Sequence, residues 1–218
     1  MTAEEFGHEF RNKKPVIIGN VNDNAHFART VSLEALVDAY GAKTVVLSSS
    51  NTYSYDKAHM SLEQYVQTVV RHGVNLRDAA NTTSYMFGDN YDPWLETLLE
   101  GYDRVHLGND DDQALSFGIG GHLSGVPFHL HGGGYSEVLH GCKRWFLYPE
   151  GVTPEFQPDE TALTWVAKRA HAGDIRDELL QCTIKPGEVL YFPSEWYHAT
   201  LNIGPTVFVS SFIREASL

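Results

Sequence analysis

The chain has 218 residues, 28 of them acidic and 16 basic, for a formal net charge of −12. This balance argues against a nucleic-acid partner, because binding to phosphates needs a basic face. No apolar run reaches the roughly 20 residues of a membrane-spanning helix, and the opening Met1–Phe6 lacks the basic and apolar regions of a signal peptide. Hydrophobic residues make up 42% of the chain, which is enough for one well-buried core.

The first half of the chain, residues 1–110, is predicted to be an extension of mixed helices and strands. Thr2 and Glu5 form a capping box for the first helix, and Ser32 and Ser61 are candidate caps of two later ones. Apolar residues at helical spacing follow each cap, whereas short apolar runs indicate strands. The expected helices cover residues 2–11, 32–40, 61–70 and 94–99, and the expected strands cover 14–19 and 44–47.

From residue 111 to 218 the pattern changes to short β runs separated by Gly and Pro. A helix-like insert over 156–172 interrupts them. Eight short strands in one block are typical of a double-stranded β-helix, the jelly roll of cupin-type barrels. The predicted fold is therefore mostly β with flanking helices, preceded by an α/β extension and forming one structural unit. The expected strands cover 115–119, 127–131, 135–140, 143–148, 181–184, 188–192, 198–202 and 207–213.

Three of the 11 histidines form a candidate metal site. His129 and His131 are two residues apart on a predicted strand, so their rings point to the same face. His198 can join them if the barrel folds the chain back. Three imidazoles meeting at one point would bind a first-row divalent metal and leave positions open. We expect His122 and His140, which flank the region, to be non-ligands.

Three motifs in this half resemble those of the JmjC family, the jumonji-type Fe(II) and 2-oxoglutarate oxygenases. Gly125–His129 resembles the run into the first metal ligand, and Gly141–Pro149 the strand that carries a co-substrate lysine. Gly187–Pro193, followed by His198 and Asn202, resembles the run into the last ligand. The likeness extends upstream to 87–90 and so covers most of the chain.

The resemblance implies a divalent metal, Fe(II), and 2-oxoglutarate as co-substrate. It implies that Lys143 pairs with the distal carboxylate of 2-oxoglutarate, that Asn202 supports the site, and that Ser136 lines the pocket. The partner would be a protein substrate or another protein. An endoplasmic-reticulum lumenal member is similar, so a lumenal location is implied; without the signal peptide that such a location needs, the location would be cytoplasmic.

Two residues depart from the family pattern. Active members carry Asp or Glu at the position of His131, which completes a 2-His-1-carboxylate triad. Histidine removes one negative charge from the site, although imidazole still suits Fe, Ni, Cu and Zn. Hydroxylases of the family often place Thr at the position of Val126, and valine has no hydroxyl to donate to a carboxylate.

Three further features leave alternatives open. Glu137 lies close to where cupins place a metal-binding Glu, so it is either a fourth ligand or a solvent-facing residue. Cys142 and Cys182 either pair or stay free. Asn81 begins a glycosylation sequon that is as readily a chance match.

Three functions are therefore compatible with the sequence. The first is an Fe(II)- and 2-oxoglutarate-dependent hydroxylase with an all-histidine site, for which the retained Lys143 speaks. The second is a catalytically silent JmjC protein that acts through protein contacts, which His131 and Val126 favour. The third is a cupin-type dioxygenase that does not use 2-oxoglutarate and to which Glu137 contributes.

Overall fold

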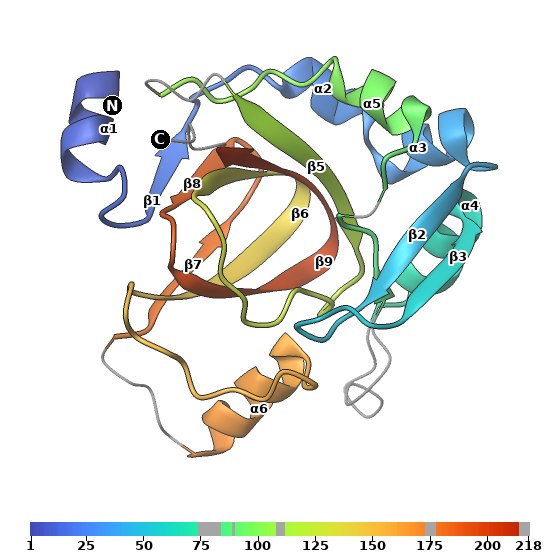
Figure 1. The fold of residues 1–218 in the computed structure, drawn as a ribbon. Coiled ribbons are helices and arrows are strands. Elements are labelled where there is room, and N and C mark those ends of the chain that lie inside the picture. Colours follow the sequence, from blue (N-terminus) through green and yellow to red (C-terminus); the bar gives the residue numbers. More distant parts are fainter. Residues whose placement is uncertain (74–83, 89, 108–111, 173–177, 214–218) are drawn as a thin grey trace.

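A roll of antiparallel strands occupies the centre of the molecule in the computed structural model (Figure 1). The structure describes residues 1–73, 84–88, 90–107, 112–172 and 178–213. The main sheet has the order β1-β8-β6-β9-β5, and β7 pairs with β6. The mostly-β prediction is confirmed. The bounds of these strands are Val16–Gly19 (β1), Gln113–Gly120 (β5), Gly134–Tyr148 (β6), Leu180–Ile184 (β7), Glu188–Phe192 (β8) and Tyr197–Ile213 (β9).

Two long strands, β6 and β9, run through both halves of the roll. The first half of β6 lies between β8 and the end of β9, and its second half lies between β7 and the beginning of β9. The strands predicted separately over 135–140 and 143–148 are therefore one continuous strand, β6. Those predicted over 198–202 and 207–213 are likewise one strand, β9. Gly141 and Gly204, read in the sequence as strand breaks, are instead bends within them, with φ of 77° and 79°.

A β-bulge in β6 decides which of its side chains enter the roll. The β6–β9 register shifts between Val138 and His140 and again between His140 and Cys142. Successive side chains of a strand alternate between faces, so residues an odd number apart share a face only if an extra residue intervenes. The bulge thus lets Val138 and Lys143 both face the interior, whereas Glu137 faces outward.

The segment before β6 lies along β9 without forming a regular strand. Backbone hydrogen bonds join Thr200 N to Val126 O at 2.9 Å and connect His129 and His198 in both directions. His129 and His198 form an isolated bridge, in place of the strand predicted over 127–131. Pro127 has no N–H to donate to a ladder, which accounts for the irregular pairing.

The N-terminal extension packs against the outside of the roll, where α2, α3 and α5 flank β5 (Figure 1). Apolar residues of its helices share one core with Phe117 and Ile119 of β5 and Val207 and Val209 of β9. The extension also joins the barrel sheet, since β1 pairs with β8. Its elements are α1 (Ala3–Glu9), α2 (Ala25–Thr30), α3 (Leu33–Tyr40), β2 (Thr44–Ser49), β3 (Lys57–Ser61), α4 (Leu62–Tyr65) continued by the π-helical turn η1 (Val66–Val70), β4 (Ser84–Tyr85) and α5 (Pro93–Leu99).

The local signals at the helix starts are confirmed. Thr2 and Glu5 form the predicted capping box, and the Ser32 and Ser61 hydroxyls accept from the backbone of the first turns of α3 and α4. The α2 helix and the β3 and β4 strands were not predicted. The insert is helical only over Ala162–Ala172 (α6), which covers the outer face of the second half of β6 and the start of β9.

Cys142 and Cys182 are both free. Cys182 lies opposite Trp145, three residues from Cys142 along β6, and this offset exceeds the reach of a disulfide of about 7 Å between Cα atoms. Asn81 lies outside the described residues. Among the helices that are described, none has the length and apolar character needed to cross a membrane.

Candidate metal centre

Three histidines converge inside one end of the roll. One ring nitrogen of each of His129, His131 and His198 lies within 4.8 Å of the others, and no other group of three or more potential ligands is found in the described residues. The pairing of the 123–129 segment with β9 places His129 directly opposite His198. The three side chains therefore converge in the structure, as the sequence predicts.

Backbone carbonyls hold all three rings in one orientation. Each Nδ1 lies 2.7 to 2.8 Å from a carbonyl oxygen: that of Pro127 for His129, Gly132 for His131 and Trp196 for His198. A carbonyl only accepts, so each Nδ1 carries the hydrogen, and each Nε2 keeps a free lone pair. Such bonds to the other ring nitrogen are typical of metal-binding histidines.

The three rings are neutral at physiological pH. Burial lowers the pKa of His129 to about 4, with a further contribution from His131. Burial also lowers the pKa of His198 well below its ordinary value and lowers that of His131. Only the neutral ring can donate a lone pair to a metal. Two bonds of about 2.1 Å span at most about 4.2 Å, so a bound ion would draw these rings slightly together.

Lys143 lies in the same cavity, on the wall formed by β6. Its side chain is buried, and its Nζ donates to Oδ1 of Asn202 at 3.2 Å and lies 3.5 Å from the ring centre of Phe208. Neither contact neutralises its charge. Burial accordingly lowers the pKa of Lys143 to about 7.

Asn202 and Ser136 belong to the paired β6 and β9 strands that form this wall. The Asn202 amide donates to the hydroxyl of Ser124 at 3.0 Å, which fixes its oxygen toward Lys143. The hydroxyl of Ser136 is fully buried and accepts from Ser210 at 3.2 Å. Ser210 lines the cavity, whereas its direct partner on β6, Ser136, is not among the lining residues.

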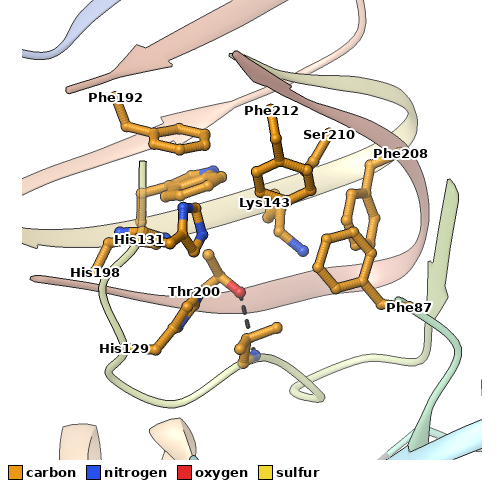
Figure 2. A pocket seen from close by; sticks show the side chains of 12 residues that line it. Phe87, His129, His131, Lys143, Phe192, His198, Thr200, Phe208, Ser210 and Phe212 are labelled. Carbon is orange, nitrogen blue, oxygen red and sulfur yellow. Dashed lines mark hydrogen bonds between the residues drawn. The ribbon is translucent and has the colours of Figure 1, made fainter. Parts of the chain in front are cut away.

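One cavity extends from the three histidines to Lys143. Figure 2 shows the three rings at one end, and the Lys143 amine between them and the Phe87 and Phe208 rings. The described residues that line it include no Asp or Glu, although the chain as a whole carries a charge of −12. They are Phe87, Val126, His129, His131, Lys143, Trp145, Phe192, His198, Thr200, Phe208, Ser210 and Phe212.

Sequence reasoning missed one polar group of the cavity. The indole N–H of Trp145 is buried and finds no acceptor within the described part of the chain. Trp145 lies two residues after Lys143 on β6, so both face the interior. This spacing was the available signal, but a buried tryptophan was more readily interpreted as core.

Glu137 is not brought to the histidines, and the hypothesis of a fourth ligand is wrong. Its carboxylate points outward from the roll and accepts from Asn22 at 2.7 Å, Asn24 at 2.8 Å and the Tyr102 hydroxyl at 2.7 Å. It does not face solvent either, since only 4% of the residue is exposed. Burial raises its pKa, while these three hydrogen bonds act in the opposite direction. The non-ligand prediction for His140 agrees with its contact to the Ala28 carbonyl.

Comparison with known proteins places this geometry in a family. The family model of the JmjC domain matches residues 138–217. The JmjC domain-containing protein 8 of Homo sapiens is 42% identical over 214 residues, which span 98% of this chain and 81% of that protein. The lysine-specific demethylase JMJ21 of Arabidopsis thaliana is 27% identical over 236 residues, which span 96% of this chain and 24% of that protein.

A solved structure shares the fold. The X-ray structure of E. coli ycfD superposes with a TM-score of 0.57 at 17% identity, covering all of this chain and 54% of that one. This likeness confirms the barrel architecture and carries no statement about activity. On the identity and coverage of its relatives, and with three converging histidines in the barrel, the chain belongs to the JmjC domain family.

Proposed function

We propose that this chain is a metal-dependent oxygenase of the JmjC type, with Fe(II) at the three histidines and a 2-oxo acid, of which 2-oxoglutarate is the family's own, as co-substrate. The observation that carries the proposal is one cavity that holds three neutral, pre-oriented imidazoles and a buried lysine that has no counter-ion among the described residues. Imidazoles suit a divalent metal, and an unpaired buried cation suits the carboxylate of a co-substrate.

The residues of the chain would divide the work as follows. His129, His131 and His198 hold the metal, and their Nδ1–H bonds to the backbone keep the rings from turning away. Lys143, which Asn202 holds in place, supplies positive charge to the cavity that would receive the co-substrate carboxylate. When bound, Fe(II) would supply the redox chemistry by which O2 oxidises a 2-oxo acid, which loses CO2, and a substrate C–H bond, with one oxygen atom going to each product.

A polypeptide is the substrate class we propose. Tyr53 and Tyr55 are 60% and 64% exposed, and their ring centres lie 5.2 Å apart. The neighbouring Thr52 donates to the carbonyl of Phe128, so the exposed rings stand beside the segment that carries His129. Exposed tyrosines are a feature of protein-binding surfaces. The name of the relative JMJ21, a lysine-specific demethylase, supports the same substrate class.

A catalytically silent protein is the second candidate, and the replacement of the usual carboxylate by His131 favours it. The third function, a cupin-type dioxygenase, loses its support because Glu137 lies outside the site. Silence and activity differ in one measurable respect, the consumption of the 2-oxo acid.

The test is CO2 release from carboxyl-labelled 2-oxoglutarate by untagged protein with Fe(II) and O2. We expect slow uncoupled release that disappears in His198→Ala and persists in His122→Ala, the matched control at an exposed histidine. His131→Asp restores the usual carboxylate and is expected to raise the rate about tenfold. Release that is absent from both wild type and His131→Asp would contradict the proposal and favour the silent protein.

A further inference from the structure

We infer that Phe208 sets the length of the co-substrate, so that the cavity accepts a 2-oxo acid shorter than five-carbon 2-oxoglutarate in preference to 2-oxoglutarate itself. This inference rests on the proposed function, because it concerns the acid that would lie between the metal and Lys143. It assigns to Phe208 the role of a specificity-determining residue.

The first observation is the position of the Phe208 ring. The Lys143 Nζ lies 3.5 Å from the ring centre, so the ring covers the cation from which a distal carboxylate would have to accept a hydrogen bond. Phe208 is only 3% exposed, and Phe87 packs against it with ring centres 5.2 Å apart. The cation–π contact partly compensates for the burial of the ammonium group.

The second observation is that the barrel makes room for this ring. Phe208 pairs directly with Gly118 of β5. A Cβ built on Gly118 would lie 2.2 Å from Cζ of Phe208, well inside van der Waals contact. The missing side chain at Gly118 therefore allows the ring to lie flat on Lys143, and the arrangement depends on both residues.

The third observation is the space that remains. The cavity has a small free volume of about 20 Å³, so a long acid can enter it only if a side chain moves. Val126, at the position where hydroxylases of the family often carry Thr, offers no hydroxyl, so that wall adds no donor for a distal carboxylate. At the histidine end, however, the Trp145 N–H has no partner among the described residues and can receive an anion. A ligand that stays between the histidines and Trp145 avoids Phe208.

The test measures binding of a series of acids to Zn(II)-loaded protein by calorimetry, with oxalate, malonate and 2-oxoglutarate as probes. Zn(II) has no redox chemistry, so the acids are not consumed. For the wild type we expect oxalate to bind at least about tenfold more tightly than 2-oxoglutarate. In Phe208→Ala, 2-oxoglutarate is expected to gain about tenfold while oxalate changes by less than about threefold.

Two further variants keep the test decisive. Phe10→Ala removes a partly buried ring of the N-terminal extension that does not line the cavity, and its oxalate-to-2-oxoglutarate ratio is expected to equal that of the wild type. Phe208→Leu keeps apolar bulk and serves if the alanine variant does not fold; a gain of about threefold for 2-oxoglutarate is expected.

The results separate the inference from the function on which it rests. Zn(II) binding with equal affinity for oxalate and 2-oxoglutarate in the wild type, or an unchanged ratio in the Phe208 variants, would overturn the role of Phe208 alone. Failure to bind Zn(II), or failure of all three acids in every variant, would overturn the proposed function together with it.

Discussion

Glu137 and Lys143 are two buried charged residues, six positions apart on one strand, whose surroundings differ in kind. Glu137 accepts hydrogen bonds from Asn22, Asn24 and Tyr102, which belong to the N-terminal extension. Among the described residues, Lys143 contacts one neutral acceptor and one aromatic ring, and the cavity lining includes no carboxylate. A satisfied buried charge is typical of a structural role, whereas an unsatisfied one indicates a binding site.

The bulge between the two residues makes this difference possible. Residues six apart on a regular strand would share a face. The extra residue between Val138 and Lys143 turns the lysine into the roll and leaves Glu137 against the extension. One irregularity of β6 thus allows the same strand to attach the extension and to furnish the cavity.

Replacing Glu137 should produce the largest change in stability. Glu137→Ala leaves two amides and a hydroxyl buried without their acceptor, and we expect it to lower the free energy of unfolding by about 3 kcal/mol. Urea denaturation measures the change. Glu150→Ala, at an exposed carboxylate, is the matched control and should stay within about 0.5 kcal/mol of the wild type. Equal effects of the two substitutions would show that the Glu137 network does not attach the extension.

Replacing Lys143 should have the opposite sign, and its effect should depend on pH. Burial lowers the pKa of Lys143 from 10.5 to about 7, so between these values the unfolded chain binds more protons than the folded one. The lysine therefore costs the metal-free protein most below about pH 7, and this cost declines by at most about 1.4 kcal/mol per pH unit as the pH rises.

Lys143→Met removes the charge and keeps the apolar stem, so it should stabilise the metal-free protein near pH 6.5, and this advantage should be clearly smaller near pH 9. Urea denaturation of both proteins across this range provides the measurement. Parallel pH profiles would mean that Lys143 has a counter-ion in solution, and the contrast with Glu137 would then be lost.

A smaller effect is expected from placing a hydroxyl in the cavity at the position of Val126. Val126 lines the cavity near Thr200, and Val126→Thr adds one donor there. A neutral hydrogen bond contributes about 1 kcal/mol, so 2-oxoglutarate should bind about fivefold more tightly. Val126→Ala, which opens similar space without a hydroxyl, is the control for calorimetry with Zn(II)-loaded protein. A gain of the same size in Val126→Ala would assign the effect to space alone.

The histidine cluster could be predicted because its signals are local. The two-residue spacing of His129 and His131 fixes a common face, and the motifs around His198 fix the strand that returns to them. Helix starts were predictable for the same reason, since a cap such as Thr2 acts within one turn.

Features that depend on register could not be predicted. The continuity of β6 through Gly141 and its bulge is set by pairing with β9, which begins 49 residues after β6 ends. Without the bulge, Glu137 could not be assigned to the outer face. The contact of Phe208 with Lys143 depends on its pairing with Gly118, 90 positions before it, and no local pattern reports that pairing.

The most direct test of the central claim is Zn(II) binding by metal-free, untagged protein, measured by equilibrium dialysis. The convergence of three neutral imidazoles predicts one ion per chain, an affinity at least about 100-fold lower in His198→Ala, and no change in His122→Ala. Binding that is equally tight in the wild type and His198→Ala, or absent from both, would contradict the metal centre on which the proposed oxygenase depends.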